Sequence, residues 1–388
     1  MQQGDRHHIV HMPFKNRNLF RITRFLLLKL PGLYKFLAKF RTARPRLLII
    51  KTDAIGDYIL FRNFIEIINS SASFKGYGID VLGNELWQDI APKYDSRFIT
   101  NFIFINPDDL YYSPIRALRL SIKLFRGNYQ TVLQPAFSRT FINDGLAGFT
   151  AAKNIIGFEG DTERMNAIHK LKTDIFYTQR VTLPENITFE FDRSRFFIEQ
   201  VLGHNVNIDG PFLNIDKGNR DGIIIFPGAG VSKRRWEAEK FVALIRLILR
   251  ESKHQIYLAG DIREVETGNY LMANLPVGRV NNLTGKTSLN QLIELIGNAT
   301  LVVSNETSAI HISAAVKTPV VCILGGGHFG RFAPYPFLIE ASPACVYEKM
   351  ECFNCNWQCI YNMPEDASFP CIAAVTLEKV WANVQLYL

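Results

Sequence analysis

The sequence predicts an α/β fold with two parallel-sheet domains in tandem, and three observations lead to this prediction. From Arg46 onward, short β-rich runs alternate with helical runs, the pattern of a parallel sheet wrapped by helices. Residues 184–221 interrupt the alternation with proline, glycine and asparagine, and it restarts at Gly222. A chain of 388 residues that is 47% hydrophobic can bury two or three cores, which excludes a largely disordered protein.

The N-terminal domain is expected at residues 46–210. It opens with a buried strand at 47–51, a turn at 52–57 and a helix at 58–69. Further strands are expected at 78–82, 102–105, 131–134 and 154–157. The irregular segment 184–221 contains the predicted domain junction.

The C-terminal domain is expected at residues 211–388. Its strands are predicted at 222–226, 255–259, 301–304 and 320–324. Apolar residues at helical spacing, among them Phe241, Leu244, Ile245 and Ile248, predict a helix after the first of these strands. Ser288 opens a helix at 289–297, and another helix follows Thr307.

Residues 1–45 form a basic, apolar leader before the first domain. Residues 1–46 hold 11 Lys or Arg and one Asp, which leaves 33 basic and 35 acidic residues in the nearly neutral remainder. A basic leader with Phe25 and Phe36 on a neutral body favours an anionic membrane surface as partner and argues against nucleic acid. The alternative is a disordered basic tail.

No apolar run is long enough to span a bilayer. The most apolar stretch, residues 25–40, is broken by Lys29, Pro31, Lys35 and Lys39, which also argue against a secretory signal. We therefore expect a cytoplasmic protein, peripheral on the inner face of the cytoplasmic membrane.

The loop after the first predicted strand contains Lys51, Thr52, Gly56 and Asp57. Gly56 permits close backbone approach, and a carboxylate at Asp57 could take a proton from an acceptor hydroxyl. The alternative is that Asp57 caps a helix N-terminus.

The loop at 227–235 follows a strand and precedes a helix, like a phosphate site. Backbone N–H groups of small residues and a helix start attract an anion, and neighbouring cations add charge. The residues are Gly228, Ala229, Gly230, Ser232, Lys233 and Arg234. A solvated basic loop is the alternative.

The segment 304–315 also starts a helix after a strand. Glu306, Thr307 and Ser308 stand at the turn, where hydroxyl and amide groups could meet a diphosphate. His311 lies one turn later and is either part of this site or a core histidine.

Five of six cysteines lie after residue 344, within a Cys-rich segment at 345–371. Cys352, Cys355, Cys359 and Cys371 have the spacing C-x2-C-x3-C-x11-C. In a cytoplasmic protein such a cluster favours a structural zinc or iron site, with reduced packing cysteines as the alternative.

The order and spacing of these motifs, together with Gly260, Glu264 and Pro319, resemble glycosyltransferase family 9, the heptosyltransferases. The resemblance implies a GT-B fold, with two Rossmann-like domains facing across a cleft. The N-terminal domain would bind a glycan or glycolipid acceptor and the C-terminal domain a nucleotide-sugar.

The resemblance also implies roles for individual residues. Asp57 would be the general base, Glu264 would hold the ribose, and Arg234 or Lys233 would contact the donor phosphate. Thr307, Ser308 and His311 fall in the segment that meets the diphosphate, where Glu306 and Ser308 replace the Asp and Gly of the family. No Asp-x-Asp pair is present, which agrees with metal-free, cofactor-free catalysis.

The resulting hypothesis is an inverting transferase that moves heptose from ADP-heptose to lipopolysaccharide or a related glycan. One alternative is a heptosyltransferase that modifies autotransporter proteins. A second is a non-catalytic, metal-stapled module that binds nucleic acid. The linkage position and the oligomeric state are not encoded in these motifs.

Overall fold

The computed structural model describes residues 16–218, 220–336, 339 and 341–388, and the chain divides into two compact units. Unit 1 comprises Met1–Thr52, Phe74–Glu85 and Ile99–Leu183. Unit 2 comprises Asp53–Ser73, Leu86–Phe98 and Pro184–Leu388. Residues 1–15 of the predicted leader lie outside the described residues, and the predicted boundary at 210/211 stays a prediction.

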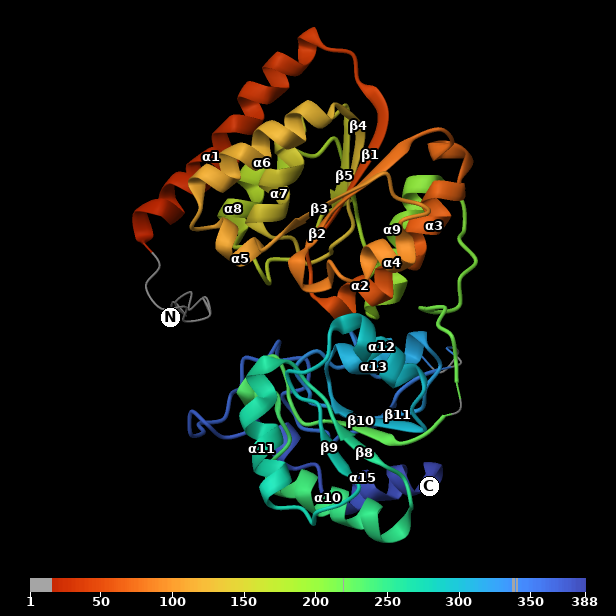
Figure 1. Ribbon diagram of the computed structural model, residues 1–388. Coiled ribbons are helices and arrows are strands. Elements are labelled where there is room, and N and C mark those ends of the chain that lie inside the picture. The colour runs from red at the N-terminus through yellow and green to blue at the C-terminus, as the bar shows by residue number, and fades with distance from the viewer. Residues whose placement is uncertain (1–15, 219, 337–338, 340) are drawn as a thin grey trace. The chain divides into compact units, whose positions relative to one another are not determined.

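Unit 1 contains a parallel sheet with the order β3-β2-β1-β4-β5-β6 (Figure 1). Its strands are β1 (Arg44–Lys51), β2 (Gly78–Asn84), β3 (Asn101–Ile105), β4 (Tyr129–Gln134), β5 (Asn154–Phe158) and β6 (Gln179–Val181). Its helices are α1 (Arg17–Leu37), α5 (Pro107–Leu110), α6 (Pro114–Gly127), α7 (Phe141–Phe149) and α8 (Ala167–Asp174). The strand order reverses between β1 and β4, so the crevice typical of open parallel sheets is expected at their carboxyl ends.

Unit 2 contains a parallel sheet with the order β12-β11-β10-β7-β8-β9, which repeats the topology of the first sheet. Its strands are β7 (Ile223–Phe226), β8 (Ile256–Leu258), β9 (Val280–Asn282), β10 (Leu301–Asn305), β11 (Val320–Ile323) and β12 (Ala344–Val346). The reversal falls between β7 and β10. The predicted tandem α/β architecture is therefore confirmed.

The helices of unit 2 come from three stretches of the chain. They are α2 (Ile55–Phe61), α3 (Asn63–Ser70), α4 (Ala91–Asp95), α9 (Glu190–Leu202), α10 (Ala238–Glu251), α11 (Val265–Ala273), α12 (Leu289–Gly297), α13 (Ser308–Ala315), α14 (Pro370–Ala373) and α15 (Leu377–Val384). The helix starting after Ser288 is confirmed, with Ser288 as its N-cap. The apolar face predicted for α10 is fully buried, with Phe241, Leu244 and Ile245 at 0% exposure.

Three expectations were wrong. The helix predicted at 58–69 begins earlier, at Ile55, and is divided into two helices at Arg62, whose guanidinium lies 2.5 Å from the Asp95 carboxylate. The segment 184–221 was expected to be irregular but contains α9. The edge strands β6, β9 and β12 were not predicted; each has three residues and pairs with a neighbouring strand on one side only.

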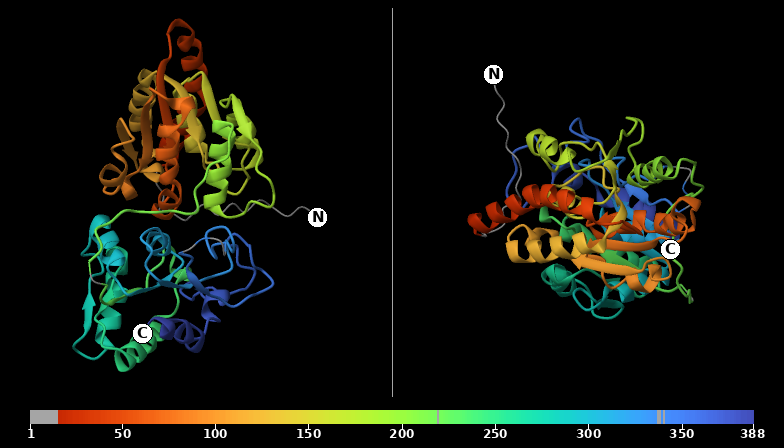
Figure 2. Two further views of the ribbon diagram at one scale, coloured as in Figure 1. Left: turned by 90° about the vertical axis from the view of Figure 1, so that its right-hand side faces the viewer. Right: turned by 90° about the horizontal axis from the view of Figure 1, so that it is seen from above.

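The described part of the leader forms α1, which packs against α6 and α7 (Figure 2). Leu27 is fully buried against Gly145, and the Tyr34 hydroxyl lies 2.9 Å from that of Ser121. Phe25, Phe36 and Phe40 are 60%, 55% and 78% exposed. This helix is thus an integral part of unit 1 that also presents an apolar face to solvent.

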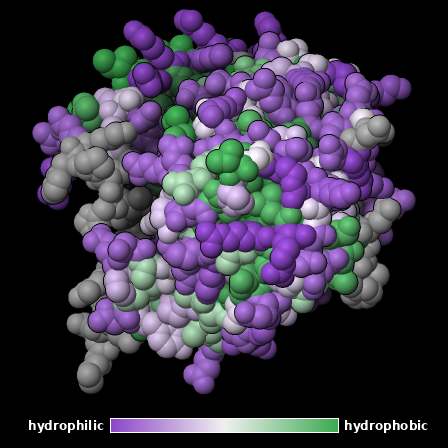
Figure 3. Space-filling view, turned by 60° about the horizontal axis from the view of Figure 1, so that its bottom comes forward, coloured by the Kyte–Doolittle hydropathy of each residue, from purple (hydrophilic) through white to green (hydrophobic). Residues whose placement is uncertain are grey.

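The surface is mainly polar where Figure 3 displays it, with apolar side chains gathered near the middle of that face. In the described part of the chain, none of the helices combines the length and apolarity that crossing a bilayer requires.

Candidate functional site

The loop between β7 and α10 leaves the sheet at the switch point of unit 2. Gly228 and Ala229 are buried, Gly230 and Ser232 are exposed, and the cations follow in a short 3-10 turn, Ser232–Arg234. The expectation that these cations stand directly at a helix start was wrong, because α10 begins only at Ala238. Trp236 intervenes and is buried in the core, where its indole N–H donates to the Val375 carbonyl oxygen at 2.8 Å.

The turn after β10 is joined to this loop by the buried side chain of Asn305. Its Nδ2 donates to the carbonyl oxygens of Pro227 at 2.9 Å and Gly228 at 3.0 Å, and its Oδ1 accepts from the Trp236 backbone N–H at 3.0 Å. Buried amides of this kind are costly to leave unpaired, so the contacts fix the loop to the turn. The predicted donor residues of both loops are brought together in unit 2.

The same turn places Glu306, Thr307 and Ser308 at the start of α13. Thr307 is the N-cap, with Oγ1 accepting from the Ala309 N–H at 3.3 Å. Among the described residues the buried Oε2 of Glu306 has no hydrogen-bond partner, and burial raises the pKa of Glu306 to about 7 although Arg234 opposes the shift. The start of α13 therefore lies beside a buried carboxyl group that gains a proton near neutral pH.

Glu264 lies against the glycine of the first loop. A Cβ built on Gly228 would stand 2.1 Å from Glu264 Cγ, so only glycine allows this approach. Glu264 Oε2 accepts from the Asp261 N–H at 2.8 Å in a capping box, and Oε1 lies 3.8 Å from Arg235 Nη2. The predicted ribose ligand is thus positioned beside the predicted phosphate loop.

The two neighbouring carboxyl groups, Asp261 and Glu264, have different pKa values. Burial and then the neighbouring Asp261 raise the pKa of Glu264 to about 7. For Asp261, burial acts in the same direction, but hydrogen bonds from Arg263 prevail and lower the pKa to about 2. Glu264 is therefore the group of the pair that changes charge near neutrality.

Asp57 lies in the first turn of α2 and is half-buried. The alternative that it caps this helix is wrong, because the N-cap is Ala54. A carboxylate in the first turn of a helix interacts favourably with the helix dipole.

Gly56 and His311 meet where α2 packs on α13. A Cβ on Gly56 would lie 2.7 Å from His311 Cδ2, so the close approach predicted for Gly56 is to this ring. His311 Nδ1 shares a hydrogen bond with the Tyr335 hydroxyl at 2.6 Å. Burial lowers the pKa of His311 to about 3, so the imidazole is neutral at neutral pH and adds no charge to an anion site.

Lys51 and Thr52 belong to unit 1, at the carboxyl end of β1. Both are buried, and Thr52 Oγ1 donates to Asn143 Oδ1 at 2.6 Å while its carbonyl oxygen accepts from Asn84 at 2.8 Å. The neighbouring strand β4 ends at Gln134, which is fully buried. Within the described residues, neither the oxygen nor the nitrogen of its side-chain amide has a hydrogen-bond partner. A polar cluster therefore occupies the switch point of this sheet.

The four predicted thiol ligands line one small cavity together with Met350, Trp357 and Phe369. Within the described residues, however, no group of three or more His, Cys, Asp or Glu is arranged to hold a metal ion. The donor set suits a soft metal, but the sulfur positions do not form a coordination sphere. Cys322 lies outside this cavity, in β11, and is fully buried.

The Cys-rich segment also contacts the phosphate loop. The Arg234 guanidinium carbon lies 4.1 Å from the centre of the Trp357 ring, and the Phe369 N–H donates to the Lys233 carbonyl oxygen at 2.7 Å. Sequence reasoning missed the roles of Trp357, Tyr335 and Asn305. Only Asn305 gave a signal, since it directly precedes the predicted helix-start motif.

The chain contains two parallel sheets of the same strand order. In unit 2, loops rich in small and charged residues follow the strands where this order reverses. This arrangement is that of a GT-B-like α/β protein. The chain belongs to glycosyltransferase family 9 (heptosyltransferase), whose family model matches residues 147–360, more than half of the sequence.

Individual relatives support this assignment. Lipooligosaccharide heptosyltransferase 2 of Haemophilus influenzae is 31% identical over 112 residues, which are 28% of this chain and 32% of that protein's length. The fold is that of Escherichia coli ADP-heptose lps heptosyltransferase II, with a TM-score of 0.64, 16% identity and coverage of 88% of this chain and 98% of that one. The iron-containing dodecameric glycosyltransferase TibC from enterotoxigenic E. coli aligns at a TM-score of 0.53 and 13% identity, over 89% of this chain and 76% of that one.

Proposed function

We propose that this protein is an inverting glycosyltransferase that transfers heptose from ADP-heptose to lipopolysaccharide or a related glycan. Family membership and the similarity to heptosyltransferases of lipooligosaccharide and lipopolysaccharide synthesis support the donor and the acceptor class. The observation that carries the proposal is the junction made by Asn305, which unites the two loops of unit 2 that would bind the donor.

In the proposed complex, Glu264 accepts hydrogen bonds from the ribose. The diphosphate lies against backbone N–H groups of the 228–230 loop, the Thr307 and Ser308 groups, and the cations Lys233 and Arg234. These groups stabilise the negative charge that develops on the leaving ADP. They are fixed before the reaction, so little reorganisation accompanies bond cleavage.

Asp57 is the proposed general base. It takes the proton of the acceptor hydroxyl as that oxygen bonds to the anomeric carbon, while the bond from this carbon to the phosphate oxygen breaks and ADP leaves. Attack from the face opposite the leaving group inverts the configuration. His311 is neutral and acts through position, holding Tyr335 and the Gly56 backbone.

The test is nucleotide release from a panel of nucleotide sugars, with a delipidated core oligosaccharide as acceptor and with or without a chelator. We expect ADP release from ADP-heptose that survives chelation. Asp57→Asn should lower kcat about 100-fold or more with unchanged ADP affinity, as removal of a general base does. Exposed Asp89 gives the matched control Asp89→Asn. Full turnover of Asp57→Asn would exclude this base.

We further propose that Cys352, Cys355, Cys359 and Cys371 hold a structural zinc or iron ion that fastens the Cys-rich segment. Support comes from the shared cavity and from the likeness to TibC, an iron-containing glycosyltransferase. Because the sulfur atoms of these four described residues do not form a coordination sphere in this structure, metal binding would require the four thiols to turn toward a common centre. Metal analysis of the purified chain should find zinc or iron that the double variant Cys352→Ser/Cys355→Ser loses. Cys345→Ser, outside the four, is the control. A metal-free wild-type protein would contradict this site.

We also propose that the protein works at the inner face of the cytoplasmic membrane, with the exposed side of α1 against anionic lipid. Phe25 and Phe36 of α1 and Phe40 of the turn that follows it supply apolar area. Exposed Arg21, Lys29 and Lys35 of the helix and Lys39 of the turn supply charge. Because Leu27 and Tyr34 are buried, deletion of the helix would open the core of unit 1. Replacing the three phenylalanines with alanine is the better test.

The triple variant should no longer sediment with phosphatidylglycerol vesicles, and the wild type should sediment with these but not with neutral phosphatidylcholine vesicles. Equal sedimentation of variant and wild type would show that these phenylalanines do not bind the protein to the membrane.

A protein acceptor is the remaining alternative. It is tested by incubating the enzyme and ADP-heptose with an autotransporter passenger domain and following its mass.

A further inference from the structure

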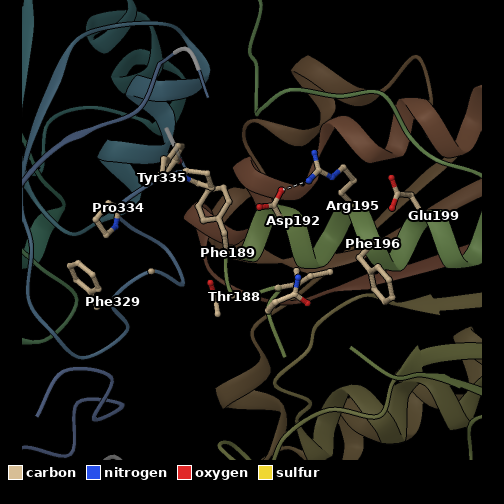
Figure 4. Close-up of a pocket in the computed structure, with 13 residues that line it drawn as sticks. Thr188, Phe189, Asp192, Arg195, Phe196, Glu199, Phe329, Pro334 and Tyr335 are labelled. Carbon is tan, nitrogen blue, oxygen red and sulfur yellow. Dashed lines mark ion pairs between the residues drawn. The ribbon is translucent and has the colours of Figure 1, made fainter. Parts of the chain in front are cut away.

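A cavity of about 540 Å³ in unit 2 lies outside the donor loops and the cysteine cluster (Figure 4). One wall is the start of α9 with the residues before it, and the other is the loop at 329–336. The lining residues are Asn186, Ile187, Thr188, Phe189, Asp192, Arg195, Phe196, Glu199, Phe329, Gly330, Pro334, Tyr335 and Pro336.

The two walls are fastened to each other. The Glu190 N–H donates to the Arg331 carbonyl oxygen at 2.8 Å, and the Arg331 side chain pairs with Glu190 Oε2 at 3.2 Å. The rings of Phe189 and Tyr335 pack with centroids 4.8 Å apart. The cavity is therefore formed before any ligand enters, as binding pockets usually are.

The lining combines aromatic rings with a short row of charged groups. Asp192, Arg195 and Glu199 follow one another along α9, and Arg195 Nη2 lies 2.8 Å from Asp192 Oδ1. The rings of Phe189, Phe196 and Tyr335 complete the cavity. A sugar ring matches this lining, because its C–H faces pack on aromatic surfaces and its hydroxyls both donate to carboxylates and accept from a guanidinium.

The charges select among ligands. Two carboxylates against one guanidinium disfavour a phosphate or an acidic sugar. A purely apolar ligand would leave Asp192 and Arg195 desolvated without new partners, which is costly. A neutral sugar satisfies both conditions.

Two side chains, those of Tyr335 and His311, connect the cavity with the proposed reaction centre. Tyr335 lines it and bonds through its hydroxyl to His311 on α13, and His311 in turn contacts Gly56 beside Asp57. We propose that this cavity is a subsite for a neutral sugar ring of the acceptor. The proposal rests on the proposed function, and it names the acceptor because the cavity shares no residue with the loops assigned to the donor.

The first experiment measures binding of a delipidated core oligosaccharide by calorimetry without donor. Wild type and the control Gln200→Ala, an exposed residue of α9, should bind equally. Phe196→Ala and Asp192→Asn should bind at least tenfold more weakly, with circular dichroism and Tm confirming that they fold. Absence of binding by the wild type, or equal binding by all four proteins, would overturn the subsite.

The second experiment compares ADP and ADP-heptose affinities in the same proteins. Unchanged affinities for both support an acceptor subsite. Weakened ADP-heptose binding with normal ADP binding would assign the cavity to the donor sugar and overturn the proposal. Nucleotide release by the wild type tests the proposed function separately: oligosaccharide binding without turnover would refute the transferase but retain the subsite.

Discussion

The side chain of Asn305 donates a hydrogen bond to the carbonyl oxygen of Gly228 over 3.0 Å and so fixes the turn after β10 to the loop after β7. These loops leave neighbouring strands at the point where the strand order reverses. One buried amide therefore sets the geometry of both proposed halves of the donor site. All three of its hydrogen bonds are made to backbone groups.

Asn305→Ala should weaken ADP binding at least tenfold and lower the free energy of unfolding by about 1–3 kcal/mol, because backbone groups lose a buried partner. Calorimetric titration and denaturant unfolding measure the two effects. Asn269→Ala, at an exposed position of the same unit, should change neither. Normal ADP affinity in a destabilised Asn305→Ala protein would show that the amide supports the fold alone.

Gly228→Ala and Gly230→Ala should differ sharply. An added Cβ at Gly228 would collide with Glu264, whereas at Gly230 there is no atom within 4 Å. We expect Gly228→Ala to lose donor affinity and Gly230→Ala to retain it, as measured by ADP titration. Equal affinities would mean that Glu264 can move away without loss of binding.

Donor affinity should fall as the pH decreases from about 8 to about 6. Burial raises the pKa of Glu264 to about 7, and the ionised Glu264 is the form that accepts from a ribose. The pKa of Glu306 is also raised to about 7, and its protonation removes negative charge beside the diphosphate, which partly offsets the fall. Arg235, Arg263 and Asp261 face Glu264, and Arg234 faces Glu306. Glu264→Gln should bind ADP more weakly and lose most of this pH dependence, whereas Glu306→Gln should retain the part due to Glu264.

The same shifts predict an opposite effect on stability. A carboxyl group whose pKa is raised on folding stabilises the folded state below its ordinary pKa of 4.5, and this contribution is lost as the pH rises through about 7. Unfolding of the ligand-free protein between pH 4.5 and 8, compared with Glu264→Gln and Glu306→Gln, measures this contribution. A pH dependence that is unchanged in both variants would contradict the assignment.

Trp357→Ala should raise the donor KM several-fold with a smaller change in kcat. Its ring lies against the Arg234 guanidinium, and such contacts contribute about 0.5–2 kcal/mol. Trp357→Phe should recover part of the affinity because an aromatic face remains. The separation of KM from kcat matters here, since general damage to the fold would lower the amount of active protein and hence kcat.

Gly56→Ala should lower kcat, because the new methyl group would press on His311 and displace α2, which carries Asp57. In Gly56→Ala/His311→Ala the collision is absent. The kcat of the double variant should therefore be close to that of His311→Ala, and higher than the value obtained by adding the effects of the two single substitutions. Strictly additive effects would argue against this contact.

Much of the architecture followed from sequence periodicity. Buried strands such as 47–51 and helices such as 289–297 can be predicted from apolar spacing and capping residues, since these are local properties of the sequence. The edge strands β6, β9 and β12 depend on pairing with a neighbour and carry no period of their own. Helix α9 was not predicted, because it lies within a segment whose prolines and glycines indicated a domain junction.

The sequence by itself determined the strand and helix alternation, the small and charged residues of the loops, and the cysteine spacing, because each is written in neighbouring residues. Only the tertiary structure decided that the Glu264 side chain packs against Gly228 and that the Trp357 ring packs against the Arg234 guanidinium. It also decided that Asn305 forms a hydrogen bond with a loop 77 residues away in the sequence. These contacts join residues distant in the chain, and strand order, which periodicity does not encode, brings them together.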